Sequence, residues 1–146
     1  MSIDPLAVSG KRLAALDYGE ARIGVAVCDE MHIVVSTRPI IKNDSKMWDV
    51  LLERLDDDRI DVVLVGVPRR HDDATTAIIE KIITFIKELQ HRTVRPVIEV
   101  DEAFSTQRAK EIMLKGNVRK KRRAQKGTKD VFAAAVILQD VLEELR

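Results

Sequence analysis

The chain has 146 residues, of which 45% are hydrophobic and 34% charged, a composition that is ordinary for a globular protein. This length predicts a single domain over residues 1–146 that buries its own core. The opening MSIDPLAVSG has no signal-peptide pattern, and no apolar run approaches the roughly 20 residues of a membrane span, so we expect a cytoplasmic protein that avoids membranes. Cys28 is the only cysteine, which excludes an internal disulfide and a thiolate zinc cluster; we expect it to fill the core.

The formal net charge of +1 hides a strong asymmetry along the chain. Residues 44–61 contain seven acids and three bases, whereas residues 108–129 contain ten bases and one acid. A block of like charge is often only solvated, or is a targeting signal. This basic block lies between two predicted helices rather than on a tail, which favours a surface that binds anions.

The first half of the chain predicts three neighbouring strands. Residues 13–16 and 23–28 are apolar runs joined by a short polar turn that contains Gly19. Residues 32–38 predict a third strand, which Pro39 would end. Short turns between consecutive strands predict an antiparallel meander.

The middle of the chain alternates helices and strands. Residues 43–45 supply cap residues for a helix that ends in the acids at 56–58, with its polar face exposed. Residues 60–67 are almost wholly apolar, as in a strand buried on both faces. Asp72 or Asp73 can cap a long helix, and residues 96–100 predict a fifth strand that is parallel to the fourth.

Two further helices are predicted near the end of the chain. Ser105 can cap a helix that Gly116 and Asn117 close, and the basic loop follows it. Thr128 can cap a last helix whose apolar residues at helical spacing face inward. The sequence therefore predicts an α/β architecture, a mixed five-stranded sheet with helices packed on its faces.

Three acids stand at positions where ligands gather in such folds. Asp17 ends the first predicted strand, Glu102 follows the fifth, and Asp130 lies in the first turn of the last helix. Each has an ordinary structural explanation: a turn former, a solvated acid, and a carboxylate that stabilises a helix N-terminus. Together, at the ends of separate elements, their hard oxygen ligands indicate a magnesium site.

Four segments in order resemble the YqgF family, also called the RuvX or Holliday-junction-resolvase-like family, which has an RNase H-like fold. They are DYGEARIGVAVCD at 17–29, VGVP at 65–68, DEAFST at 101–106, and DVFAA at 130–134 followed by IL at 137–138. They are similar to the family's opening motif, its VGLP strand end, its DERLTT segment and its D..AA..IL helix. Position 103 departs from the pattern, because Ala103 stands where the family usually has Arg, a residue that would pair with phosphate or carboxylate.

The resemblance implies strand order 3-2-1-4-5 with helices on both faces of the sheet. It also implies that Asp17, Glu102 and Asp130 are catalytic residues that bind two Mg²⁺ or Mn²⁺ ions for phosphodiester hydrolysis, with Asp17 bridging them. Bases would then hold the nucleic-acid backbone without reading its sequence. These predicted binding residues are Arg22, Arg119, Lys120, Lys121, Arg122, Arg123 and Lys126.

The family relationship favours a metal-dependent nuclease that processes the 5′ end of pre-16S ribosomal RNA in ribosome biogenesis. The partner would be structured RNA, although branched DNA is the alternative, as in a Holliday junction resolvase. A nucleic-acid-binding protein without catalysis is a second alternative, which the Ala103 departure supports. The phosphate chemistry of actin-like kinases is a weaker one, since those enzymes need two such lobes and this chain has length for one.

Overall fold

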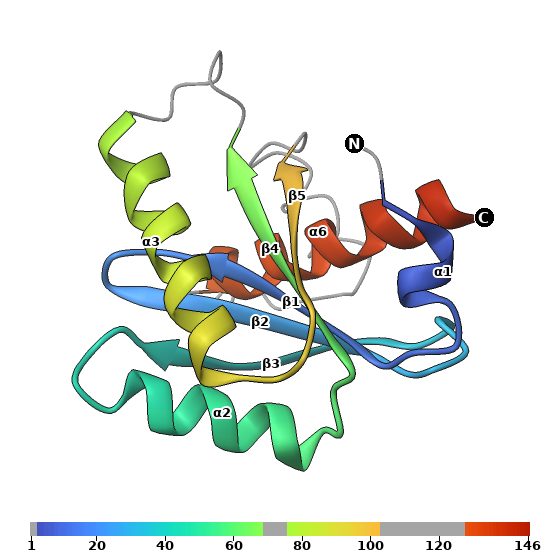
Figure 1. The fold of residues 1–146 in the computed structure, drawn as a ribbon, viewed down its shortest axis with the longest axis horizontal. Helices are drawn as coiled ribbons and strands as arrows, with labels where there is room; N and C mark the ends of the chain where they lie inside the picture. The colour runs from blue at the N-terminus through green and yellow to red at the C-terminus, as the bar shows by residue number, and fades with distance from the viewer. Residues whose placement is uncertain (1–2, 69–75, 103–127) are drawn as a thin grey trace.

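The computed structural model describes residues 3–68, 76–102 and 128–146. In this part of the chain there are five strands and four helices (Figure 1). In chain order they are α1 (Pro5–Val8), β1 (Leu13–Tyr18), β2 (Arg22–Cys28), β3 (Val35–Lys42), α2 (Met47–Asp57), β4 (Val62–Pro68), α3 (Thr76–Arg92), β5 (Val97–Glu102) and α6 (Thr128–Leu145).

The strands form one mixed sheet in the order β3-β2-β1-β4-β5, as predicted. The meander is confirmed, because β1 pairs antiparallel with β2 and β2 pairs antiparallel with β3. The predicted parallel pair is also confirmed, since β4 lies parallel to both β1 and β5. The carboxyl ends of β1, β4 and β5 therefore point to one edge of the sheet.

Helices cover both faces of this sheet (Figure 1), and a hydrophobic layer lies on each face. Helices α2 and α3 pack on one face, over side chains such as Leu16 and Val65. Helix α6 and Val8 of α1 pack on the other face, over Leu13 and Leu64. Alternate residues of β1 and β4 serve the two layers, which explains why both strands are apolar throughout. Cys28 is buried in the α6 layer, as predicted, and burial raises the pKa of its thiol.

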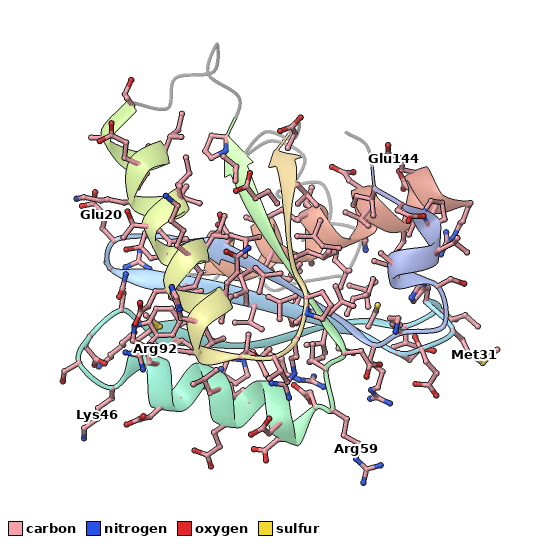
Figure 2. The ribbon with its side chains drawn as sticks, in the orientation of Figure 1. Glu20, Met31, Lys46, Arg59, Arg92 and Glu144 are labelled. Atoms are coloured by element: carbon pink, nitrogen blue, oxygen red, sulfur yellow. The ribbon has the colours of Figure 1, made fainter. Side chains whose placement is uncertain are left out.

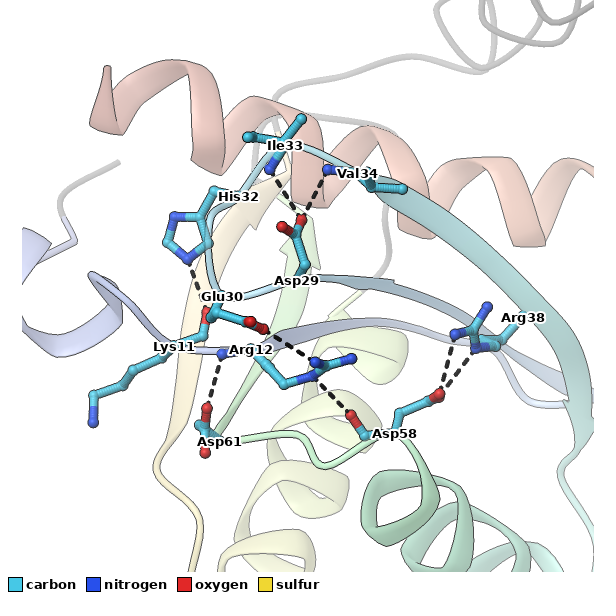
Figure 3. Close-up of polar contacts among 10 residues, drawn as sticks. All are labelled: Lys11, Arg12, Asp29, Glu30, His32, Ile33, Val34, Arg38, Asp58 and Asp61. Carbon is cyan, nitrogen blue, oxygen red and sulfur yellow. Dashed lines mark hydrogen bonds and ion pairs between the residues drawn. The ribbon is translucent and has the colours of Figure 1, made fainter.

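The predicted third strand at residues 32–38 is displaced, because the structure places β3 at Val35–Lys42. The carboxylate of Asp29 accepts hydrogen bonds from the backbone N–H groups of Ile33 and Val34, at 3.0 and 2.8 Å, which removes both from the ladder (Figure 3). Pro39 does not end the strand. It lies where the register with β2 shifts, in an edge strand, and such positions tolerate a missing N–H group.

The boundaries around α2 also differ from the prediction. The N-cap position is Lys46, without a side-chain cap bond, and Asp44 instead accepts from the Lys46 N–H group at 2.9 Å. At the other end Arg59 has φ of +53°, and its N–H group and that of Ile60 donate to the carbonyls of Asp56 and Leu55. This is a Schellman motif, so Ile60 belongs to the helix cap and β4 starts only at Val62.

Other expectations were incomplete or lie outside the described residues. The short helix α1 was not predicted; Asp4 caps it and Pro5 occupies its first position. The predicted caps Asp72 and Asp73, the helix after Ser105 and the basic loop fall outside the part that the structure describes. No helix in the described ranges is both long and apolar enough to cross a membrane.

Candidate functional site at the carboxyl edge of the sheet

Asp17 lies inside β1, one residue before its end, rather than in the turn that follows. It pairs with Gly24 of β2 in the antiparallel register, and its side chain is half-buried. Side chains alternate along a strand, so Asp17 lies on the same sheet face as Leu13 and Ala15, the face that α6 covers. This position holds a carboxylate at the edge of an apolar layer.

The turn after Asp17 is held by contacts from distant parts of the chain. The Asn43 side-chain amide donates to the Gly19 carbonyl at 2.9 Å, and the Asn43 backbone N–H group donates to the Ala21 carbonyl at 3.0 Å. Gly19 is required sterically, because a Cβ atom there would lie 2.6 Å from the Arg22 carbonyl oxygen. No sequence pattern indicated this role for Asn43, which was expected to cap α2.

An exposed ion pair links the same turn to α3. The Lys81 ammonium donates to the Glu20 carboxylate at 2.8 Å, and this hydrogen bond raises the pKa of Lys81. Both side chains are more than half exposed, so water screens the pair. The strand end that carries Asp17 is thus tied to the loop before α2 by Asn43 and to α3 by Lys81.

Glu102 is the last residue of β5, at the same edge of the sheet as Asp17. The β1–β4 register matches Leu16 with Val65, and the β4–β5 register matches Val65 with Glu99. Residue 102 therefore lies two positions beyond the level of Asp17, about 7 Å along the strands, and two strands away, about 10 Å across the sheet.

Asp130 is the third residue of α6, which crosses the face of the sheet that carries Asp17 (Figure 1). The other end of α6 lies beside the turn between β2 and β3, where the Arg146 side chain donates to the His32 carbonyl at 3.2 Å. That turn is at the start of β1, since Leu13 pairs with Cys28. The first turn of α6 consequently lies toward the end of β1, near the edge where Asp17 is placed.

Arg22 is the first residue of β2 and lies within the turn region that follows Asp17. Alternation along β2 places it on the same face as Ala26 and Cys28, which is also the face of Asp17. The other predicted binding residues lie outside the described residues: Arg119, Lys120, Lys121, Arg122, Arg123 and Lys126.

Other polar side chains gather at the opposite end of the sheet and have structural partners. Arg12 donates to Glu30 and to the Asp58 carbonyl, and its N–H group donates to the Asp61 carboxylate (Figure 3). Arg38 forms an ion pair with Asp58 that raises the pKa of the arginine. Among the described residues, no three His, Cys, Asp or Glu residues form a group that could hold a metal ion. The structure describes the backbone positions of Glu102 and Asp130 but not their side chains, so a metal site that they form with Asp17 stays a prediction.

The sheet order and the helices on both faces define an RNase H-like fold. The family model described as "RuvX: Holliday junction resolvase" matches residues 11–144. The chain belongs to the RuvX family.

Curated relatives and solved structures agree with this assignment. A protein of Christiangramia forsetii named "Putative pre-16S rRNA nuclease" is 34% identical over 134 residues, which are 91% of this chain and 98% of the relative. A protein of the same name from Syntrophus aciditrophicus is 32% identical, over 92% of this chain and 89% of the relative.

The fold is similar to that of two proteins solved in complex with a Holliday junction. Thermus thermophilus RuvC has a TM-score of 0.60 at 15% identity, over 92% of this chain and 95% of that chain. Fowlpox virus resolvase has a TM-score of 0.58 at 16% identity, over 92% of this chain and 98% of that chain. At these identities the likeness shows the fold alone.

Proposed function

We propose that this protein is a cytoplasmic, divalent-metal-dependent nuclease that cleaves phosphodiester bonds and processes the 5′ end of pre-16S ribosomal RNA. The main support is the placement of residues 17, 102 and 130 near one edge of the sheet, in a chain of the RuvX family. The names of the curated relatives favour the RNA substrate.

The chain's own residues fit Mg²⁺ or Mn²⁺ better than a softer metal. The proposed donor set is three carboxylates, Asp17, Glu102 and Asp130, and hard oxygen ligands suit these ions. The single thiol, Cys28, is buried and lies at the end of β2 that is farther from Asp17. When bound, such ions activate a water molecule and stabilise the leaving oxygen of a phosphodiester.

Basic side chains would place the substrate over these carboxylates. Arg22 lies on the same sheet face as Asp17 and would contact a phosphate near the scissile bond. The predicted binding residues at positions 119–123 and 126 would hold the backbone farther away. Contacts with phosphates position a nucleic acid without reading its sequence, so specificity would come from substrate shape.

The first test compares a labelled pre-16S rRNA fragment with a four-way DNA junction, in Mg²⁺ and in Mn²⁺. We expect Asp17→Asn to abolish cleavage while the free energy of unfolding is kept or raised, because crowded carboxylates repel one another without metal. Asp101→Asn is the matched control, since Asp101 is an exposed acid of the same edge, next to Glu102 in β5. Wild-type cleavage rates in Asp17→Asn at saturating Mg²⁺ would refute the metal site.

Glu102→Gln and Asp130→Asn distinguish catalysis from binding alone. If Asp130 only stabilises the N-terminus of α6, its replacement costs roughly 0.3 to 1 kcal/mol and leaves cleavage unchanged. As metal ligands, both residues are needed for cleavage, and both variants should still bind nucleic acid. Tight binding by the wild-type protein without cleavage of either substrate would instead support the noncatalytic alternative, with Ala103 as its cause. Cleavage of the junction but not of the RNA would identify a resolvase.

A further inference from the structure

A groove of about 820 Å³ opens on the face of the sheet opposite to α6. It lies between the turn after β1, the start of α2 and one side of α3, so it is separate from the proposed metal site. Its volume is in the range of sites that bind small ligands or short peptide segments. Neither the proposed nuclease reaction nor the predicted binding residues use it.

Aromatic side chains stack along the wall of this groove. The rings of Tyr18 and Phe85 have centroids 4.8 Å apart, and those of Trp48 and Phe85 are 5.2 Å apart and nearly parallel. The Arg92 guanidinium lies 4.9 Å from the centroid of the Trp48 ring. The chain has only five aromatic side chains of this kind, and three of them are here. Phe85 is a core residue, but Tyr18 and Trp48 are only half-buried.

The charged side chains that line the groove are mostly acidic. They are Glu20, Glu80 and Glu88, against the single ammonium of Lys81. Lys81 pairs with Glu20 at 2.8 Å, and Glu88 pairs with Arg92 at 2.9 Å. The carboxylate of Glu80 is exposed and has no partner among the described residues. Figure 2 labels Glu20 and Arg92, which mark this side of the molecule. The uncompensated charge of Glu80 therefore makes the lining negative, and a negative lining repels phosphate and attracts cations.

We propose that the groove binds a basic segment of a partner protein, through an arginine or lysine side chain flanked by apolar residues. The cationic group would lie beside Glu80, while the methylene stem and the apolar neighbours would pack on Tyr18 and Trp48. Arginine suits this site best, because its planar guanidinium can pair with the Glu80 carboxylate through two hydrogen bonds while its stem packs on the apolar wall. The inference does not depend on the proposed nuclease function, since the two sites lie on opposite faces of the sheet.

Trp48 is the only tryptophan, so its fluorescence reports on the groove directly. Titration with a short peptide of alternating arginine and leucine at low salt should give a saturable change in Trp48 fluorescence. A peptide of alternating glutamate and leucine, with the same apolar residues, should give none. No saturable change with the arginine peptide up to millimolar concentration would overturn the proposal.

Variants of exposed residues locate the binding surface. Glu80→Lys should weaken arginine-peptide binding about tenfold or more, which corresponds to about 1.4 kcal/mol. Thr84→Arg, on the exposed side of α3 within the groove, should block it. Glu53→Lys is the matched control, because Glu53 is an exposed acid of α2 outside the groove lining, and it should bind as the wild type does.

Two results would contradict the inference even if peptide binds. If Glu53→Lys and Glu80→Lys weaken peptide binding equally, the net charge of the protein and not this groove determines the affinity. A single-stranded RNA oligonucleotide that quenches Trp48 and displaces the peptide would identify the groove as a site for nucleobases instead. Nuclease assays of Glu80→Lys are made in parallel. They show whether a loss of peptide binding is separate from a loss of cleavage.

Discussion

Asp29 directs the path of the chain between β2 and β3 with one carboxylate. The N–H groups of Val34 and Ile33 both donate to it, and these hydrogen bonds, that of Val34 foremost, hold the pKa of the Asp29 carboxyl below its usual range (Figure 3). His32 completes the turn with φ of +57° and a ring nitrogen 2.8 Å from the Lys11 carbonyl oxygen. The turn is therefore built from polar contacts that apolar periodicity does not reveal.

Replacing Asp29 should make stability less sensitive to acid. Because its pKa is lowered in the folded state, Asp29 stabilises the protein above the unfolded pKa of about 3.9, and this stabilisation is lost as pH falls through the folded value. Asp29→Ala should thus have a lower free energy of unfolding than the wild type at pH 7, with a smaller difference at about pH 2 to 3. Urea unfolding at both pH values measures this. Gln90→Ala, at an exposed residue of α3 that does not titrate, is the control and should show the same difference from the wild type at both pH values. A constant difference for Asp29→Ala would contradict the assignment.

Single residues were predictable where their chemistry conflicts with their surroundings. Asp17 stands out as a carboxylate in an apolar strand, so a place at the edge of the sheet could be inferred for it. Cys28 lies in an apolar run, so a place in the core could be inferred for it. Asn43 could not be understood in this way. Its partner Gly19 is 24 residues away, and a polar residue before a helix is more often a cap.

The end of α2 shows how an element can be closed by an unfavourable residue. Arg59 occupies the left-handed position of the Schellman motif, where glycine is the usual choice. Its side chain is exposed and points away from the ribbon (Figure 2). The backbone conformation, not a side-chain contact, therefore dominates the energetics at this position.

Arg59→Gly should raise the free energy of unfolding by about 1 kcal/mol. A non-glycine residue in this region is disfavoured by roughly 1 to 2 kcal/mol, part of which glycine loses again through the greater entropy of the unfolded chain. Arg59→Val should lower stability, because a β-branched side chain is strained further there. Urea unfolding of the wild type and the two variants should give the highest free energy of unfolding with glycine at position 59, then arginine, then valine. The reverse order for glycine and arginine would show that the arginine side chain makes a stabilising contact.

Elements were predictable where a long pattern repeats and less so at their ends. The buried strand at residues 60–67 and the long helix after Asp73 were both predicted, and the structure confirms them as β4 and α3. The four residues of α1 are too few for a helical period. The limits of β3 depend on Asp29 and on the tolerance of an edge strand for Pro39, and both are tertiary effects.

At the scale of the whole molecule, the acidic segment at residues 44–61 has structural partners elsewhere in the fold. Several acids of residues 44–61 are structural: Asp56 pairs with Arg95 at 2.6 Å, and Asp58 pairs with Arg38 at 3.0 Å. The expectation that the polar face of this helix is simply exposed was therefore incomplete. The basic residues at 119–126 lie outside the described residues, and their role stays a prediction.

The candidate site was predictable to the level of backbone positions. Acids at strand ends and at a helix start could be selected from the sequence because parallel strands bring their carboxyl ends to one edge. The register now places residue 102 two strands from Asp17, and the direction of α6 places Asp130 toward the same edge. Strand order came from the family resemblance, because apolar runs alone do not specify which strands are neighbours.

The last prediction concerns salt dependence of nucleic-acid binding. Changing Arg119, Lys120 and Lys121 to glutamine should weaken binding to all sequences alike, because interactions with phosphates carry no sequence information. For each phosphate that is no longer neutralised, the slope of log affinity against log salt concentration should fall by about 0.7 to 0.9. The matched control changes Lys46, Arg59 and Lys87, exposed bases of the α2 and α3 side, to glutamine, with the same change of net charge. Fluorescence anisotropy with RNA at several salt concentrations measures both slopes. If the slope falls equally in the two variants, only net charge matters, and the basic segment is not the binding surface.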